Sequence, residues 1–347
     1  MAPKPKGSVD ACPTPLAKVY RGSAVEAVHH GSIAVVNEQG ELTHYAGEPE
    51  MVTSMRSSVK PFQALPLLMT GGFDHFGFSV KQLAIMCASH NGTDEHRELV
   101  VSNLKAAGNS VEDLQCGSHW PLGMRLNNEF PTAGEENDPL RHNCSGKHSG
   151  FLALTKFLNE DTNEYLNPDS KMQKLIKQAV ADMCEYPVDK IGVAIDGCSA
   201  PVFSFPLINL ARGFKNLAIG QGKTLEMQKA LERIFEAMTS FPKLVAGEKR
   251  FDYDLMRSLA GNAICKVGAE SVEGIGFAEQ KLGVAVKISD GNSRALWPVC
   301  LEVLRQLDIV DSVNKFPFLQ VYERPEVKNY TKKVTGKIEP VFELKKV

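Results

Sequence analysis

The chain has 347 residues, of which 43% are hydrophobic and 23% charged, and its formal net charge is −2. This composition is ordinary for a globular protein with one large core or two moderate ones. With a net charge near zero, the chain does not indicate the basic face that nucleic-acid binders usually carry. No stretch approaches the ~18 uninterrupted apolar residues of a membrane span, and the start lacks the apolar segment of a signal peptide. We therefore expect a cytoplasmic protein with mostly reduced cysteines that binds neither nucleic acid nor membrane.

The N-terminal part of the chain predicts strands. Residues 1–16 are rich in proline, lysine and glycine and predict an extended lead-in, after which we expect a single domain over residues 17–347. β-branched residues on both sides of a turn at 37–41 predict an antiparallel hairpin. The expected strands cover residues 17–21, 24–36 and 42–47.

The middle of the chain predicts helices separated by irregular segments. Helical patterns cover residues 80–87, 94–104, 151–158, 171–184, 205–213 and 222–240. Residues 107–142 contain repeated glycine and proline and predict a long irregular stretch, which in a compact protein is often functional. A short apolar run at 191–195 predicts a strand, and residues 196–201 predict the turn that follows it.

The last third of the chain returns to strands. Apolar and β-branched runs predict three successive strands and then a closing helix. The strands cover residues 263–267, 274–278 and 282–288, and the helix covers 293–307. Strands at both ends with helices between them predict an α+β fold, in which an antiparallel sheet is built from both termini around a helical middle region.

One stretch combines a hydroxyl with an amine. Ser57 and Lys60 are three residues apart, so they share one face of a helix that begins near Ser57 and tolerates Pro61 in its first turn. A serine nucleophile needs a base within hydrogen-bond reach, and a lysine serves once burial or a second cation lowers its pKa. The alternative is a serine N-cap before a core helix. The spacing also recurs at residues 240–243 and 312–315, so it leaves both interpretations open.

Two further motifs follow in a meaningful order. Ser89-His90-Asn91 lies in an expected break between helices, and Lys266-Val267-Gly268 lies on an expected strand. Together with the serine–lysine stretch they match the S-x-x-K, S-x-N and K-T-G order of serine β-lactamases and penicillin-binding proteins. Ser89 follows Ser57 unusually closely for a β-lactamase, and no export signal is present.

Five stretches in one order resemble the Rhizobium-type L-asparaginases. They are residues 55–63, 87–92, 143–148, 196–201 and 266–270. The resemblance implies a serine β-lactamase-like fold and a homodimer that hydrolyses L-asparagine to L-aspartate and ammonia. It also implies two Ser–Lys tandems, Ser57 with Lys60 and Ser89 with Lys266. Lys287 also lies on a late strand, but only Lys266 begins a K-x-G-A-E motif.

The implied chemistry is a two-step acyl transfer. Ser57, rather than its neighbour Ser58, has a lysine three residues on, and we expect it to attack the side-chain amide and form a β-aspartyl ester. We expect Ser89 to relay protons and water to hydrolyse the ester. The resemblance implies an oxyanion hole made by the backbone N–H of Ser57 and one near Ala269.

The resemblance also assigns a metal and substrate contacts. From the residues alone, Cys144 and Cys198 are packed or free thiols, because two cysteines are too few for a structural zinc site. The resemblance implies a zinc ion held by Cys144, Lys147 and Cys198, which we expect to orient the substrate or maintain the site. The candidates for binding the substrate are Arg56, Asn91, His148, Asp196, Ala269 and Glu270.

Three alternatives to an asparaginase stay open at this point. One is a glutaminase on the same fold, and another is a different serine amidohydrolase or esterase. The third is a catalytically silent binding protein of the same fold, although the presence of both serines and both lysines argues against lost catalysis. Ammonia assays with both amides, beside a chromogenic β-lactam or ester, separate these possibilities.

Overall fold

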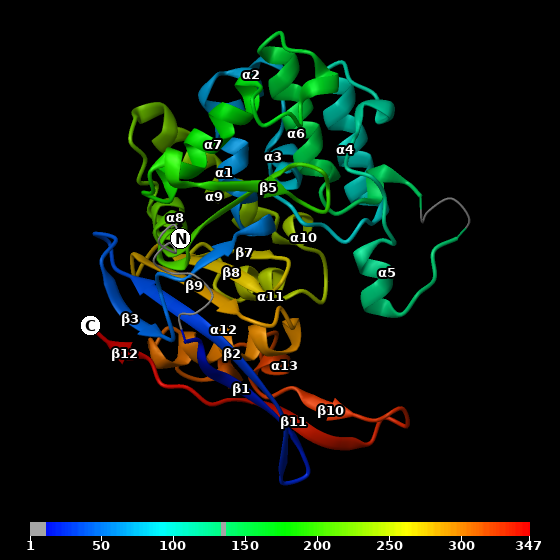
Figure 1. The fold of residues 1–347 in the computed structure, drawn as a ribbon. Coiled ribbons are helices and arrows are strands. Elements are labelled where there is room, and N and C mark those ends of the chain that lie inside the picture. Colours follow the sequence, from blue (N-terminus) through cyan, green and yellow to red (C-terminus); the bar gives the residue numbers. More distant parts are fainter. Residues whose placement is uncertain (1–11, 133–136) are drawn as a thin grey trace, which may run out of the picture.

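The computed structural model describes residues 12–132 and 137–347 (Figure 1). Strand β1 begins at Thr14, so the end of the predicted lead-in is already part of the sheet. The rest of that prediction, over residues 1–11, lies outside the described residues. Among the described residues, no helix combines the length and the apolar character needed to cross a membrane.

The main sheet is antiparallel and joins the two ends of the chain, which confirms that part of the predicted fold. Its strands follow the order β10-β11-β1-β2-β9-β8-β7, with β3 beside β2 and β12 beside β3. Their bounds are β1 Thr14–Arg21, β2 Ala24–Val36, β3 Leu42–Ala46, β7 Ala263–Gly268, β8 Val272–Phe277, β9 Leu282–Ile288, β10 Glu326–Lys328, β11 Val334–Pro340 and β12 Lys345–Lys346.

Strands β10 to β12 and the pairing of a second sheet were not predicted from the sequence, although one strand of that sheet confirms the strand predicted at residues 191–195. The second sheet has the order β4-β6-β5 and consists of β4 Val52–Ser54, β6 Pro201–Pro206 and β5 Gly192–Ile195. Strand β6 lies where the end of the predicted turn at 196–201 meets the start of the helix predicted at 205–213. These strands are short or contain Gly and Pro, so their alternation of apolar and polar residues is weak.

Helices form most of the middle region, as predicted (Figure 1). They are α1 Lys60–Met69, α2 Gly72–His75, α3 Val80–Met86, α4 Asp94–Ala106, α5 Leu122–Asn127, α6 Ser145–Phe157, α7 Lys171–Met183, α8 Leu207–Ile219, α9 Leu225–Ser240, α10 Pro242–Val245, α11 Phe251–Ser258, α12 Ser293–Gln306 and α13 Gln320–Glu323. Short 3₁₀ helices cover Arg56–Val59, Val111–Asp113, Pro139–Arg141, Thr162–Glu164, Val188–Lys190 and Val313–Lys315.

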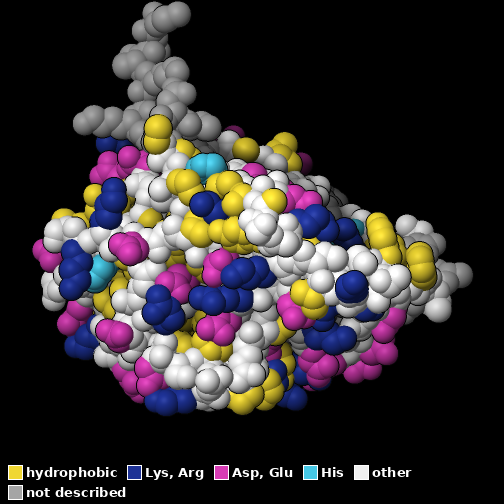
Figure 2. All heavy atoms as spheres, turned by 90° about the horizontal axis from the view of Figure 1, so that it is seen from below, with side chains coloured by type: hydrophobic (Ala, Val, Ile, Leu, Met, Phe, Trp, Pro, Cys, Tyr) yellow, Lys and Arg dark blue, Asp and Glu magenta, His cyan; other side chains and the backbone are white. Residues whose placement is uncertain are grey.

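The sheet lies between helices. Figure 1 shows α8 above it and α12 below it. Glycine allows α8 to approach closely, because a Cβ at Gly283 would lie 2.0 Å from Ala211 O of that helix. The face seen from below intersperses Lys and Arg with Asp and Glu (Figure 2), which agrees with the nearly balanced charge of the chain.

Candidate active site

Ser57 lies on a strained turn between β4 and α1. Arg56 before it has a left-handed backbone with φ of 48°, a conformation that costs energy for a residue other than glycine and that clusters at functional sites. The turn is a 3₁₀ helix, and the α-helix begins only at Lys60, three residues later than predicted. Ser58 is fully buried and donates to Met55 O at 2.7 Å, whereas Ser57 is half-buried and lines a cavity.

That cavity, of about 480 Å³, brings several predicted residues together. Strand β7 forms one wall, and Gly268 permits this because a Cβ there would lie 2.7 Å from Met55 O. Both predicted serines lie in the lining. The polar lining residues include Ser57, Ser89, Arg125, Asn143, Arg250, Glu270, Ser271 and Ser293, and Ala269 also contributes.

Lys60 lies behind the cavity wall and is 1% exposed. Its ammonium donates to Ala88 O at 2.6 Å, to Ser89 Oγ at 3.0 Å and to Asn143 O at 3.2 Å. The expected hydrogen bond from Lys60 to Ser57 is absent from the described residues. The physical reason is that the segment after α3 and the loop before α6 offer three acceptors, which use all three ammonium protons.

Lys266 approaches from the opposite side, on β7, and is fully buried. Its ammonium donates to Val267 O at 2.8 Å and lies 3.7 Å from Asp252 Oδ2. In the described parts of the chain it has no hydrogen bond to Ser89, which was its expected partner. The alternative lysine on β9, Lys287, donates to two backbone carbonyls and lines another cavity.

Burial lowers the pKa of both lysines. For Lys60 the loss of hydration is the largest cause. For Lys266 burial lowers the pKa to about 8, the Asp252 carboxylate opposes this, and the positive charge of Lys60 adds to it. Two amines whose basicity is brought toward neutral pH thus lie behind a cavity lined by two serine hydroxyls.

A thiol cluster lies next to this site. Cys144 precedes α6, Lys147 lies in its first turn, and Cys198 lies in the turn between β5 and β6. The Lys147 ammonium donates to Cys198 Sγ at 3.2 Å. A hydrogen bond from the Cys198 thiol holds the pKa of Cys144 well below its ordinary value. That bond and burial raise the pKa of Cys198.

A family model described as L-asparaginase II matches residues 17–340. The chain belongs to the L-asparaginase II family. Among curated proteins, no significant match is found. This family supports an amidohydrolase activity.

Solved structures add only distant similarity. Mglu in its native form has a TM-score of 0.45 and 13% identity, over 82% of this chain and 66% of Mglu. Mglu in its glutamate form has a TM-score of 0.38 and 15% identity, over 81% of this chain and 62% of Mglu. The chain thus spans just under two thirds of the length of these structures. Similarity at this level is too low to assign fold or function.

The thiol cluster fits a zinc ion by the chemistry of its donors. Cys144, Lys147 and Cys198 are buried and linked by hydrogen bonds, so two sulfurs and one nitrogen lie close together. Zinc prefers such ligands, and three of them leave a fourth position open. The Lys147 ammonium loses solvation on burial, but the neighbouring thiols raise its pKa overall, so binding would have to displace its proton.

An ion pair connects the cluster to the strained turn. Arg56 Nε donates to Asp196 Oδ1 at 2.5 Å, and Cys198 Sγ lies 3.4 Å from Asp196 Oδ2. Burial tends to raise the pKa of Asp196, but the Arg56 guanidinium lowers it overall. Both residues line a neighbouring cavity beside Glu270, so the structure groups three of the predicted substrate-binding residues.

Besides Arg56 and Asp196, two more predicted substrate-binding residues lie outside the serine cavity. His148 is fully buried in α6, where its Nδ1 lies 2.7 Å from the Tyr165 hydroxyl. Asn91 donates to Glu248 O at 3.1 Å and accepts from Arg250 Nη1 at 3.3 Å. Both side chains therefore support the walls of the site rather than face the cavity.

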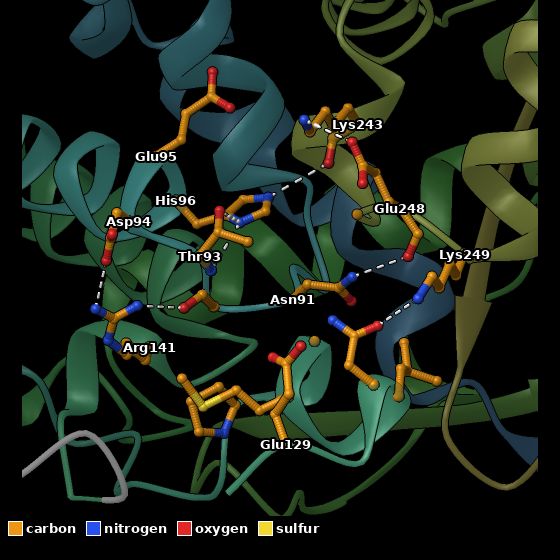
Figure 3. Close-up of a pocket in the computed structure, with 17 residues that line it drawn as sticks. Asn91, Thr93, Asp94, Glu95, His96, Glu129, Arg141, Lys243, Glu248 and Lys249 are labelled. Carbon is orange, nitrogen blue, oxygen red and sulfur yellow. Dashed lines mark hydrogen bonds and ion pairs between the residues drawn. The ribbon is translucent and has the colours of Figure 1, made fainter. Parts of the chain in front are cut away.

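Asn91 lines a second cavity of about 530 Å³ on the other side of α5 (Figure 3). Its charged side chains mostly pair with each other: Arg141 with Asp94 at 2.5 Å, and Lys243 with Glu248 at 2.9 Å. Neither serine nor lysine of the predicted tandems lines it. Both predicted serines line the serine cavity instead.

Three residues of the site were missed in the sequence. Asn143 lies inside a matched stretch, and its backbone oxygen binds Lys60. Arg250 lines the serine cavity, and Asp252 is the carboxylate beside Lys266. For Asn143 the matched stretch was an available signal, but Arg250 and Asp252 belong to no motif and reach the site only through the fold.

Proposed function

We propose that the protein hydrolyses the side-chain amide of L-asparagine to L-aspartate and ammonia through a serine ester. The observation that carries the proposal is the buried contact of Lys60 with Ser89, in the wall of a cavity that Ser57 also lines. Family membership supports an amide substrate.

The proposed reaction uses Ser57 as the nucleophile. The Ser57 oxygen bonds to the amide carbon, and the Ser57 proton passes through Ser89 to whichever of Lys60 and Lys266 is uncharged. The C–N bond then breaks and ammonia leaves with the returned proton. Water attacks the resulting ester and restores the hydroxyl. The backbone N–H groups of Ser57 and Ala269 would donate to the oxyanion.

The substrate's charged groups have candidate partners in the lining. Arg250 and Arg125 offer cations to the α-carboxylate, and Glu270 offers a carboxylate to the α-ammonium. Zinc held by Cys144, Lys147 and Cys198 would tie the start of α6 to the turn between β5 and β6 and so maintain this side of the site.

The proposal includes a serine β-lactamase-like fold. Its support is the placement of three motifs: Ser57 just before a helix, Ser89 in the break between α3 and α4, and Lys266 on β7 of the sheet. A homodimer and a cytoplasmic location stay predictions of the resemblance and the composition.

Ammonia release tests the proposal directly. Purified protein is assayed with L-asparagine and with L-glutamine, with and without a chelator, beside a chromogenic β-lactam and an ester. We expect ammonia from asparagine at a kcat/KM well above that for glutamine. Faster turnover of glutamine would show that glutamine, not asparagine, is the substrate. Cleavage of only the ester or the β-lactam would show that the protein is not an amidohydrolase of amino-acid amides.

A further inference from the structure

A carboxylate that no motif predicted lies beneath Lys266. Asp252 of α11 is 1% exposed. Its Oδ2 accepts the backbone N–H of Val267 at 2.9 Å and lies 3.7 Å from the Lys266 ammonium. One oxygen therefore fixes strand β7 beside the cavity and also faces the amine of the preceding residue.

A second carboxyl group lies next to the first. Glu273 of β8 is fully buried and pairs across the sheet with Val267. Neither of its carboxyl oxygens has a hydrogen bond of good geometry among the described residues, although the backbone N–H of Lys266 lies near enough to oppose the rise in its pKa. One oxygen of Asp252, one of Glu273 and Cys265 Sγ lie within 4.8 Å of one another.

Two buried carboxyl groups this close do not both ionise, because their charges repel in a medium that screens poorly. The hydrogen bonding decides which of them carries the charge. Asp252 accepts the Val267 N–H and faces the Lys266 cation, whereas the Lys266 backbone N–H has only a minor effect on Glu273. Burial and the Asp252 charge raise the pKa of Glu273 well above its ordinary value.

We propose that Asp252 carries one negative charge beneath Lys266 while its neighbour Glu273 stays protonated, and that this charge holds the Lys266 amine in place and sets the pH at which it becomes a base. The catalytic half of this inference rests on the proposed function. Asp252 and Glu273 are positioning residues, since they act on the reaction only through Lys266.

The other groups around Lys266 define what the charge has to oppose. Those whose charge acts on it are Asp252 of α11, Lys60 of α1, Arg250 just before α11 and Glu273 of β8, and the Cys87 thiol also lies nearby. Two of them are cations that favour loss of the Lys266 proton, as burial does. A single carboxylate charge opposes all three effects and so keeps the lysine near its titration midpoint at neutral to mildly basic pH.

The pH profile of kcat/KM for ammonia release tests the proposal with three variants. Asp252→Asn removes the charge, so Lys266 loses its proton more easily and the midpoint of the acidic limb moves to lower pH by about one unit or more. Glu273→Gln replaces a neutral acid by a neutral amide, so its midpoint stays at the wild-type value. Asp254→Asn is the matched control, because Asp254 is a buried carboxylate of the same helix that binds Tyr322 instead.

Two results would overturn the inference. One is an Asp252→Asn profile that is lowered at every pH without a shifted midpoint, which is the behaviour of a purely structural residue. The other is a Glu273→Gln midpoint that shifts as far as that of Asp252→Asn, because Glu273 would then carry the charge. Loss of a bound metal in Glu273→Gln, measured by elemental analysis, would also overturn it, because Glu273 would then be a charged metal ligand and not a neutral acid.

Unfolding measurements separate this inference from the proposed reaction. A lysine whose pKa is lowered in the folded state makes the protein more stable as pH rises from the folded pKa to the unfolded one. We expect this rise to begin at lower pH in Asp252→Asn than in the wild type, and to keep its position in Glu273→Gln. If the rise shifts as expected but asparagine is not hydrolysed, the inference about the carboxyl pair is supported and the proposed reaction is contradicted.

If Asp252→Asn is unfolded, a 13C NMR titration of Lys266 in Glu273→Gln decides the question. A midpoint that differs from that of the wild type contradicts the inference.

Discussion

The two buried lysines reach the site from opposite sides and are held in different ways. Lys60 comes from the helical side, and its ammonium binds two backbone carbonyls and the Ser89 hydroxyl. Lys266 comes from the sheet side, where it binds one carbonyl and faces the Asp252 carboxylate. Lys60 is therefore held by three hydrogen bonds to neutral groups, with the Cys144 thiol as a neighbour that can carry charge, whereas Lys266 faces a carboxylate.

The two lysines therefore differ in how firmly each ammonium is positioned and in how readily each loses its proton. All three protons of the Lys60 ammonium have acceptors, so its position is well determined while it is charged. Lys266 has fewer hydrogen bonds, and its pKa falls to about 8. Lys266 is thus better suited to accept a proton near neutral pH, whereas Lys60 is better suited to orient Ser89. The spacing in the sequence had favoured Lys60 as the base for Ser57.

Replacing the two serines gives the largest expected effect. Ser57→Ala removes the proposed nucleophile and should lower ammonia release by more than about 10³-fold, because covalent catalysis is lost. Ser89→Ala removes a relay and should leave a larger residual rate. Mass spectrometry of the acyl-enzyme during turnover tells the two apart. A β-aspartyl adduct that persists in Ser57→Ala would make Ser89, with its Lys60 partner, the nucleophile.

Removing each lysine tests how it is held. Lys266→Met leaves the Asp252 charge buried without a partner and should cost about 3–5 kcal/mol in the free energy of unfolding. Lys60→Met leaves two backbone carbonyls without donors, at about 1–3 kcal/mol each. Denaturant unfolding at constant pH measures both. Adding Asp252→Asn should restore much of the loss in Lys266→Met and nothing in Lys60→Met, and equal rescue of both would refute the comparison.

The sequence predicted the motifs better than their contacts. Ser57, Ser89, Cys144 and Cys198 lie in short polar turns next to regular elements, so they could be recognised locally, and the structure brings them to one region. The partner of each lysine could not be predicted in this way. Lys60 contacts Ser89 because α1 and the end of α3 pack together, and no local spacing encodes that approach.

The sheet shows the same limit. The three late strands and the N-terminal hairpin have clear apolar patterns and were predicted. Strand β11 was not, although it pairs with β1 and completes the connection of the two termini. It contains Gly336 and Pro340 and is only partly buried, so its stability depends on its neighbour rather than on its own pattern.

The pH dependence distinguishes the two lysines without a mutation. A base must be uncharged, so if Lys266 serves, kcat/KM should rise about tenfold per pH unit below 8 and level off above it, given a pKa of about 8. The folded protein binds fewer protons at Lys266 than the unfolded chain does between pH 8 and the ordinary lysine value of 10.5, so stability should also rise over that interval. A flat rate profile from pH 6 to 9 would exclude Lys266 as the titrating base.

The thiol cluster should affect one side of the site more than the other. Cys144 interacts with the Lys60 charge, and the Lys266 environment contains no member of the cluster among its described partners. Cys198→Ser or a strong chelator should therefore lower kcat by roughly tenfold and lower Tm, because a metal ligand that supports the Ser89 side is lost. The midpoint of the acidic limb should not move, since Lys266 keeps its neighbours.

Cys184→Ala removes a buried thiol elsewhere and serves as the control. A midpoint that shifts on chelation would show that the two sides titrate together, and full activity of a metal-free protein would refute the metal's proposed role.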